Sequence, residues 1–466
     1  MTRIDASNYY ECDPQSHKDG SPERYPKNHI NYSALLNVVK WIDSGYRLFG
    51  SHGFKFKKAM LKEFDSSAPL DKYLGNEVDI KENRDIIESF CDGIDNNPYL
   101  SAIGRFLLKK MATDWLKNRK KVLQHYDANK DFIEANGKFK APVIITGSPR
   151  SGTTLLQRLM SEDPNTRSPF TYEMEAVLPP LAADADPMKD PRIKKSGAAM
   201  ATVSKLAPGF LEKFAESHLW SATEMEESYI YMLAHNGMHF LNQPNAGKIY
   251  TDKMFTMKGK RPVFRYERMF FKTLDAYRPA KSHWTLKSPS YADFFPVMME
   301  EFTDARIVLT HRNPLITLPS ISRLEESWCI AFDRDGAFDK QAFGAYNVPY
   351  VKGCIMEPLK YRKKHPEKEN QFFDCMYDDF FSDPIGMVKK IYNHFDLEYT
   401  EELEKRMRAY LENNKQGKYG RHTYSLEEYG FDGQALFEEF KEYMEHYDYG
   451  IPEKIERKAS FDFGLK

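Results

Sequence analysis

A short glycine-containing loop carries residues that could bind a phosphate group. Residues 147–154 read GSPRSGTT, with two glycines separated by four residues. An apolar, β-branched run, residues 142–146, precedes the loop, and an apolar pattern at helical spacing, residues 155–160, follows it. A strand, a glycine loop and a helix in this order bring backbone N–H groups and the positive end of a helix dipole to one point. The stretch therefore predicts a cradle for a phosphate-linked anion.

The loop departs from the ATP-type phosphate loop at one position. In that motif a Lys follows the second glycine, whereas Thr153 and Thr154 follow Gly152 here. The basic residue lies inside the loop instead, at Arg150. This favours an anion other than the γ-phosphate of ATP. The structural alternative is a glycine turn that only starts a helix.

Positive side chains also follow two further predicted strands. Residues 283–286 lead into Lys287, and residues 305–310 lead towards Arg312. In open parallel sheets, ligands bind at the carboxyl ends of the strands. Either cation alone would be more ordinary as a surface salt bridge. Together with Arg150 they predict a site for a ligand with several anionic groups.

The alternation of strands and helices predicts an α/β fold. A weaker strand at residues 372–376 extends the series, and the alternation implies a parallel sheet with buried strands. We expect a three-layer core of the P-loop NTPase type around a central parallel sheet. The ARIVLTHR strand does not end in the Asp that would hold Mg²⁺ in an ATPase.

Composition shifts divide the chain into three parts. Residues 1–28 are a polar lead-in, residues 29–140 a helical N-terminal region, and residues 141–455 the α/β domain. Within that domain, residues 181–280 are rich in Met and Lys and predict a helical cap on the substrate side. Its clearest helix is predicted for residues 224–240.

Charge and cysteine content exclude several classes of function. The 466 residues carry a net charge of −1, so no basic field favours nucleic acid as a partner. The lysines within residues 98–126 are interpreted as a solvated helix face. The five cysteines are scattered without a C-x-x-C pair, which predicts neither a metal cluster nor a disulfide framework. The absence of an apolar run of about 18 residues predicts a cytoplasmic protein with no membrane span.

The spacing of Arg312 and Ser320, eight residues apart, adds a specific resemblance. The chain resembles the sulfotransferases that use 3′-phosphoadenosine 5′-phosphosulfate (PAPS). It is most similar to the broad branch related to the tyrosylprotein sulfotransferases, with a helical N-terminal extension. The resemblance runs from about residue 97 to residue 450 and rests on motifs in a fixed order: PRSGTT, TYE, LKSP, HRNP, YxD…DP and GKYGRHTYSLEEYG.

The resemblance implies PAPS as co-substrate and assigns its contacts. Arg312 and Ser320 would hold the 3′-phosphate, and Tyr377 would contact the adenine. The loop that holds the 3′-phosphate in cytosolic sulfotransferases has the pattern R-K-G-x-x-G, from which this chain departs at its first two positions. Lys418 and Arg421 are therefore the expected contacts there. The residues implied for the 5′-phosphosulfate are Arg150, Ser151, Gly152, Thr153 and Thr154.

Sulfuryl transfer requires a general base and a cation. The base takes the proton of the acceptor, and the cation stabilises charge on the oxygen that bridges to the leaving phosphate. By the resemblance, Glu173 in TYE is the favoured base, and His218 is the alternative. Lys287 is assigned to the bridging oxygen or sulfuryl group, and Arg150 is a further catalytic candidate. The reaction has no evident need for a metal.

The sequence thus predicts a PAPS-dependent sulfotransferase that acts by in-line displacement. The acceptor would be a hydroxyl or amine of a small, apolar, phenolic or sterol-like molecule, because Met and Phe are frequent in residues 181–280. A P-loop nucleotide or small-molecule kinase and a non-catalytic nucleotide-binding scaffold are the alternatives. The sequence leaves open the identity of the acceptor and whether the chain forms a homodimer.

Overall fold

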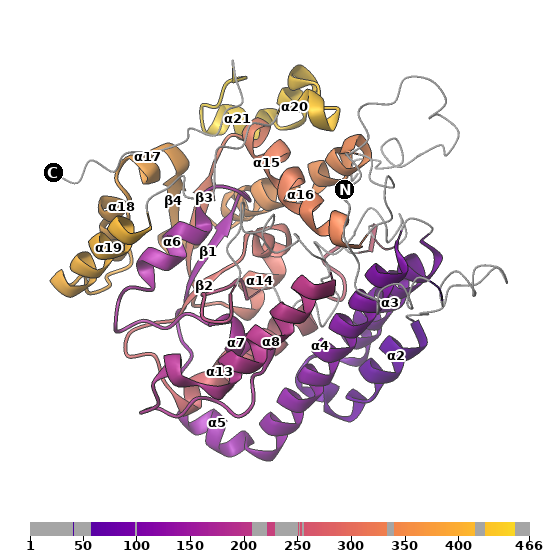
Figure 1. Cartoon of the computed structure of the whole chain (residues 1–466). Helices are drawn as coiled ribbons and strands as arrows, with labels where there is room; N and C mark the ends of the chain where they lie inside the picture. The colour runs from indigo at the N-terminus through magenta and orange to yellow at the C-terminus, as the bar shows by residue number, and fades with distance from the viewer. Residues whose placement is uncertain are drawn as a thin grey trace.

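A parallel sheet lies at the centre of the molecule, with helices on both faces (Figure 1). The computed structural model describes residues 41, 57–97, 100–206, 221–228, 250, 252–253, 256–332, 340–414 and 425–452. Its four strands are ordered β2-β1-β3-β4. Their bounds are β1 (Val143–Gly147), β2 (Thr285–Lys287), β3 (Arg306–His311) and β4 (Phe372–Met376). The predicted α/β fold with a central parallel sheet is confirmed.

Strand register brings the loops that follow β1, β2 and β3 to the same edge of the sheet. Ile145 of β1 pairs with Lys287, the last residue of β2, and Gly147 pairs with Thr310 of β3. Strands of this kind are buried on both faces. Apolar residues that face one side are Ile144, Leu286, Ile307 and Leu309. Those that face the other side are Val143, Ile145 and Val308.

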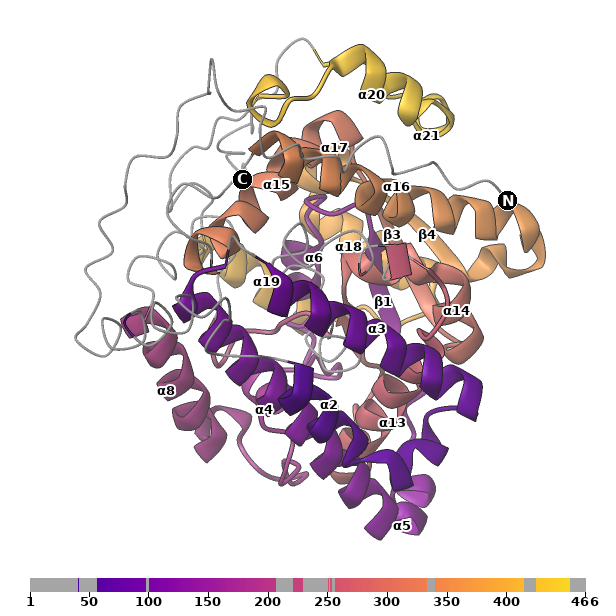
Figure 2. The ribbon, with the colours of Figure 1, turned by 90° about the vertical axis from the view of Figure 1, so that its right-hand side faces the viewer.

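The first face is covered by α13 (Arg261–Tyr277) and by the N-terminal helices. Buried aromatic residues of α13, such as Phe264 and Phe271, join the same core as α4 (Ala102–Ala128). Residues 261–277 are therefore a core helix, which corrects their prediction as part of a substrate cap. Figure 2 shows the other N-terminal helices beside α4. They are α2 (Lys57–Asp65), η2 (Ala68–Tyr73), α3 (Glu77–Asn96) and α5 (Lys130–Asn136), and α14 (Phe295–Glu301) completes this layer.

The second face is covered by the helix that follows the glycine loop, α6 (Thr153–Met160). Leu156, Leu159 and Met160 of α6 are buried against the sheet. The remaining helices of this layer are α17 (Tyr377–Ser382), α18 (Pro384–His394) and α19 (Glu401–Asn413). The start of α6 is thereby fixed at the edge where β1 ends.

A third apolar cluster surrounds the helix that follows β3, α15 (Pro314–Phe332). It packs against α16 (Lys340–Lys364) and against the C-terminal helices. Those helices are η6 (Glu427–Tyr429), α20 (Gly433–Glu439) and α21 (Lys441–His446). Two short 3₁₀ helices flank the sheet, η4 (Pro289–Phe294) after β2 and η5 (Pro366–Gln371) before β4.

The described part of the segment between α6 and α13 combines short helices with irregular chain. It contains α7 (Thr171–Glu175), η3 (Pro187–Lys189) and α8 (Pro191–Leu206). Residues 221–228 are not helical, because Met225 forms an antiparallel bridge with Phe170. The predicted helix therefore does not begin at residue 224, and residues 229–240 lie outside the described residues.

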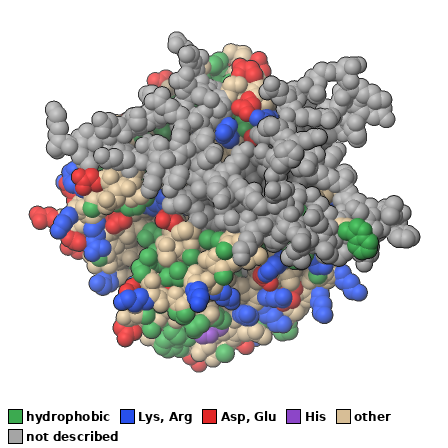
Figure 3. Space-filling model, in the orientation of Figure 1, with side chains coloured by type: hydrophobic (Ala, Val, Ile, Leu, Met, Phe, Trp, Pro, Cys, Tyr) green, Lys and Arg blue, Asp and Glu red, His purple; other side chains and the backbone are tan. Residues whose placement is uncertain are grey.

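Charges of both signs share the surface. On the described part of the face in Figure 3, Lys and Arg side chains are interspersed with Asp and Glu. On α4, Asp114 lies 2.5 Å from Lys110 and 3.9 Å from Lys117, as expected of a solvated helix face. Among the described residues, no helix is long and apolar enough to cross a membrane.

Candidate active site

The glycine loop adopts a conformation that its sequence makes accessible. Gly147 and Gly152 have φ values of 115° and 89°, in the region that glycine enters at little cost. A Cβ atom at Gly147 would lie 2.6 Å from the carbonyl oxygen of Thr310. Arg150 also has a positive φ, 60°, which turns the loop between the two glycines. The loop closes against β3 and delivers the chain to the first turn of α6.

Hydroxyl groups fasten this loop to the sheet. The Ser151 Oγ lies 2.7 Å from the Thr310 Oγ1, which in turn donates to the carbonyl oxygen of Thr146 at 3.0 Å. The Ser148 amide donates to the Thr310 carbonyl at 2.9 Å. The buried Ser151 hydroxyl thus holds the loop in place, and its predicted contact with the sulfuryl donor stays a prediction.

Four of the residues predicted to bind the sulfuryl donor lie together where β3 and β4 end. Arg312 donates to the carbonyl oxygen of Arg150 at 2.7 Å, and its guanidinium lies 3.9 Å from the ring centroid of Tyr377. The Nε of Arg150 lies 3.3 Å from the Ser320 Oγ. Two guanidinium groups, a hydroxyl and an aromatic ring in one place can hold a phosphate and stack on a base. Arg150 lies with this group, although it belongs to the glycine loop.

The loop that carries Arg312 is held in place by contacts with the C-terminal segment, residues 443–450. The His311 ring lies between Asp374, at 2.8 Å, and the Tyr443 hydroxyl, at 2.9 Å, and stacks on Tyr447. Burial lowers the pKa of His311, although Asp374 opposes that shift. The Asn313 side chain donates to the Gly450 carbonyl at 2.8 Å. Residues 443–450 therefore fix the direction in which Arg312 leaves the sheet.

Lys287 connects the start of α6 with a pair of carboxylates. Its side chain is 0% exposed, and its Nζ lies 2.7 Å from Glu227 and 3.9 Å from Glu226. The same Nζ lies 3.4 Å from the Thr154 Oγ1. The Glu227 side chain is 25% exposed and so is accessible to a second reactant. A cation and an accessible carboxylate beside a phosphate loop are the two groups that sulfuryl transfer requires.

The acidic pair was not predicted as part of the site. The sequence predicts the start of a helix at residue 224 here and so gives the pair no role in the site. The available signal was the pairing of Glu226 and Glu227 in a segment with few other charges. That signal does not indicate which strand end the segment packs against. The packing depends on the bridge between Met225 and Phe170, which the sequence does not predict.

Glu173 lies in a different environment from the one expected of a general base. Its side chain is 0% exposed, and Arg167 lies 2.6 Å away. Its second oxygen accepts from the Phe170 amide at 3.3 Å, because Glu173 is the third residue of α7 and turns back over the helix start. Arg167 also stacks on Trp284 and donates to the Leu274 carbonyl. This enclosure argues against a general-base role for Glu173.

Three predicted site residues cannot be located in this arrangement. His218, Lys418 and Arg421 lie outside the described residues. Their predicted roles stay predictions. The described residues contain no group of three or more His, Cys, Asp and Glu side chains placed to hold a metal ion.

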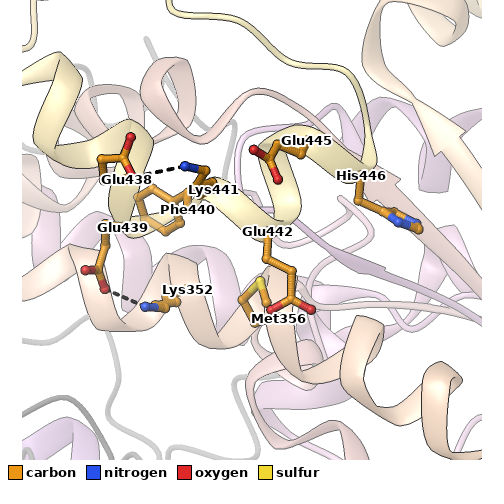
Figure 4. A pocket seen from close by; sticks show the side chains of 9 residues that line it. All are labelled: Lys352, Met356, Glu438, Glu439, Phe440, Lys441, Glu442, Glu445 and His446. Atoms are coloured by element: carbon orange, nitrogen blue, oxygen red, sulfur yellow. Dashed lines mark hydrogen bonds and ion pairs between the residues drawn. The ribbon is translucent and has the colours of Figure 1, made fainter.

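A surface groove between α16 and the C-terminal helices is distinct from these groups. Figure 4 shows one ion pair across it, Lys352 with Glu439 at 2.6 Å, and one within its C-terminal side, Lys441 with Glu438 at 3.5 Å. Glu442 and Glu445 also line it, so carboxylates outnumber cations. An acidic lining repels a polyanionic ligand, and the groove is therefore not the donor site.

Comparison with known proteins agrees with the architecture and the loop. The sulfotransferase family profile matches residues 142–401, more than half of the chain. The chain therefore belongs to the sulfotransferase family. The matched residues include the glycine loop, β2 with Lys287, and the strand that ends before Arg312. The enzyme class predicted from the motifs is confirmed.

Individual relatives are distant. The chain is 22% identical over 292 residues to the omega-hydroxy-beta-dihydromenaquinone-9 sulfotransferases of Mycobacterium bovis and Mycobacterium tuberculosis, a match that covers 62% of this chain and 71% of theirs. Sulfotransferase STF9 from Mycobacterium avium shares the fold, with a TM-score of 0.69, 24% identity, and coverage of 84% of this chain and 97% of that one. Sulfotransferase STF1 from Mycobacterium tuberculosis also shares the fold, with a TM-score of 0.64 and 21% identity. The match covers 81% of this chain and 97% of that one.

Proposed function

We propose that this sulfotransferase uses PAPS as its donor. The donor carries anionic groups at both ends of one nucleotide. The glycine loop and the start of α6 would receive the 5′-phosphosulfate. Arg312, Ser320 and Arg150 would receive the 3′-phosphate, with Tyr377 near the adenine. The support for this is the cluster in which Arg312 lies 2.7 Å from the Arg150 carbonyl and 3.9 Å from the Tyr377 ring centroid.

The proposed chemistry is an in-line displacement at sulfur. The acceptor oxygen forms a bond to sulfur while the bond from sulfur to the bridging oxygen breaks, which leaves 3′,5′-ADP and a sulfate ester. Glu227 accepts the hydroxyl proton of the acceptor. Lys287 stabilises the negative charge that develops on the bridging oxygen. The single observation that carries this assignment is the contact of Lys287 with both Thr154, at 3.4 Å, and Glu227, at 2.7 Å.

Donor binding would also change the partner of Lys287. Oxygens of the phosphosulfate would compete with Glu227 for the ammonium group. A carboxylate that loses its ion pair becomes a better proton acceptor. The pair would therefore keep Glu227 inactive until the donor is bound.

For the acceptor we propose an alcohol on an apolar carbon skeleton. Two relatives are named for sulfation of an omega-hydroxy menaquinone derivative. The chain shares only 22% identity with them, so the proposal extends to the class of molecule and not to that compound. Isoprenoid, sterol and phenolic alcohols are suitable test compounds.

The test uses purified protein and ³⁵S-labelled PAPS. We expect label to pass to at least one alcohol in an acceptor panel and 3′,5′-ADP to be released in equal amount. Thermal stabilisation by 3′,5′-ADP but not by ATP with Mg²⁺ would separate the proposal from a nucleotide kinase. Stabilisation by ATP with Mg²⁺ alone would contradict the donor assignment.

A further inference from the structure

A buried carboxyl group lies close to the segment that carries the candidate base. Glu267, on α13, is 0% exposed, and none of the described residues forms an ion pair with it. Its Oε1 accepts from the Tyr291 hydroxyl, Ser228 lies close enough to affect its pKa, and its Oε2 has no partner among the described residues. Burial raises its pKa to about 8, so the group is mostly protonated at neutral pH.

These contacts form a chain that leads to the candidate base. The Tyr291 hydroxyl donates to Glu267 and is also hydrogen-bonded to the Ser228 hydroxyl. The Ser228 amide donates to the Lys287 carbonyl at 3.3 Å. Ser228 is thus held by its side chain on one side and by its backbone on the other. It is the residue after Glu227, so the chain fixes the backbone that presents Glu227 to Lys287.

The turn after β2 is held on its other side in a related way. Ser290 is hydrogen-bonded to the Tyr350 hydroxyl at 3.0 Å, and both residues are buried. Tyr291 follows Ser290 directly, so two neighbouring residues of the turn are anchored in opposite directions. The turn that begins at Lys287 therefore has little freedom to move.

The cost of the buried carboxyl indicates that its position matters. A carboxyl group buried without a cation loses hydration that its hydrogen bonds only partly replace, whereas an apolar side chain would pack in the same space without that loss. The contacts that offset this cost at Glu267 all lead to the Ser228 segment. The hydrogen-bond chain therefore has a use beyond packing α13.

We propose that Tyr291 and Glu267 are positioning residues that hold the Glu227 carboxylate at Lys287 through Ser228. This inference rests on the proposed role of Glu227 as general base. Neither residue needs to touch donor or acceptor. A base held within a narrow range of positions abstracts a proton faster than one that moves, and misplacement by about 1 Å can cost about 100-fold in rate.

The experiment compares Tyr291→Phe with a matched variant elsewhere. Tyr429 donates to Glu326 at 2.8 Å, and both are buried, so Tyr429→Phe removes the same kind of contact away from Lys287. In Tyr291→Phe we expect kcat to fall about tenfold or more, with the Kd for 3′,5′-ADP within about twofold of the parent. In Tyr429→Phe we expect kcat within about twofold of the parent, whatever its loss of stability.

Two further measurements separate positioning from a general structural role. Glu267→Gln keeps an acceptor for Tyr291 and should retain kcat within about threefold, whereas Glu267→Leu should lose about as much as Tyr291→Phe. Amide hydrogen exchange at Ser228 should accelerate in Tyr291→Phe and not in Tyr429→Phe.

The outcomes distinguish this inference from the proposed function. An active parent whose kcat survives Tyr291→Phe overturns the positioning role and leaves the proposed function intact. A parent that transfers no sulfuryl group from PAPS overturns the proposed function. In that case unchanged exchange at Ser228 also overturns the positioning of the segment, and accelerated exchange supports it.

Discussion

Two glutamates of this protein form ion pairs of nearly equal length in very different surroundings. Glu173 lies 2.6 Å from Arg167, and Glu227 lies 2.7 Å from Lys287. The Glu173 side chain is 0% exposed, whereas that of Glu227 is 25% exposed. Contact with a cation therefore does not identify a catalytic carboxylate. Access for a reactant and proximity to the phosphate loop distinguish the two.

The cations of the two pairs differ in the same way. The Nη1 of Arg167 donates to the carbonyl oxygens of Leu274 and Arg278, and the guanidinium stacks on Trp284. These contacts of Arg167 are internal to the protein and maintain the packing beside β2. Lys287 instead has two carboxylates and the Thr154 hydroxyl around its ammonium group. The Lys287 ammonium group can exchange one of these partners for an anionic ligand at small cost, whereas the Arg167 guanidinium cannot exchange its internal partners in this way.

The largest effect is expected from Lys287→Met, which keeps the length of the side chain and removes its charge. We expect kcat to fall about 1,000-fold, because loss of one group that stabilises developing charge costs about 10²–10³ in rate. Sulfuryl transfer from labelled PAPS measures this. Binding of 3′,5′-ADP is the control for folding, and a variant with kcat near that of the parent would remove Lys287 from the chemistry.

Glu227→Gln should have the next largest effect. Removal of a general base typically costs about 10²–10⁴ in rate, and we expect the loss in kcat with little change in 3′,5′-ADP affinity. Lys287 is buried but keeps the Glu226 carboxylate at 3.9 Å, so the loss of stability should be smaller than that of a buried cation left without any carboxylate. Glu226→Gln is the matched control, since that carboxylate lies 3.9 Å from Lys287. Equal losses in the two variants would show that the pair acts as one charge.

Glu173→Gln should show the opposite pattern. Loss of one partner of a buried ion pair leaves an uncompensated charge, here on Arg167, and costs about 3–5 kcal/mol of stability. We expect a lower Tm and, at a temperature where the variant is folded, kcat within about threefold of the parent. A large loss of kcat with unchanged Tm would restore Glu173 as the general base and reverse the comparison.

The two glutamates also show how far the sequence could lead. The loop, the parallel sheet, and the placement of Lys287 and Arg312 at strand ends follow from local patterns, because short apolar runs mark where buried strands begin and end. The strand order β2-β1-β3-β4 is not predicted by such runs. The environment of Glu173 does not, since its partner Arg167 becomes visible only when residues 161–170 fold back along β2. The register of Thr285 with the Arg167 carbonyl is a long-range contact of this kind. The position of Glu227 beside Lys287 could not be predicted for the same reason, because it depends on the bridge between Met225 and Phe170.

Arg312→Lys examines the other end of the donor and should have a smaller effect. Lys keeps the charge but loses the planar contact with Tyr377 and the directed hydrogen bond to the Arg150 carbonyl. We expect the Kd for 3′,5′-ADP to rise about tenfold, as measured by calorimetry. Arg406→Lys is a suitable control, because Arg406 lies in an exposed pair with Glu402 on α19. An unchanged Kd for 5′-AMP would assign the loss to the 3′-phosphate, and equal losses for both nucleotides would contradict that assignment.

Glu267 completes the comparison as a buried glutamate with no ion pair among the described residues. Burial raises its pKa from 4.5 to about 8. Between these two values the folded protein holds more protons than the unfolded chain, so this group lowers stability progressively as pH rises through that window and adds no further dependence above it. Glu267→Gln removes this contribution. Relative to the parent, the Tm of the variant should therefore rise between pH 5 and pH 8. A Tm difference that is constant over this range would mean that Glu267 is ionised in the folded state, and its hydrogen bond from Tyr291 would then be a charged one.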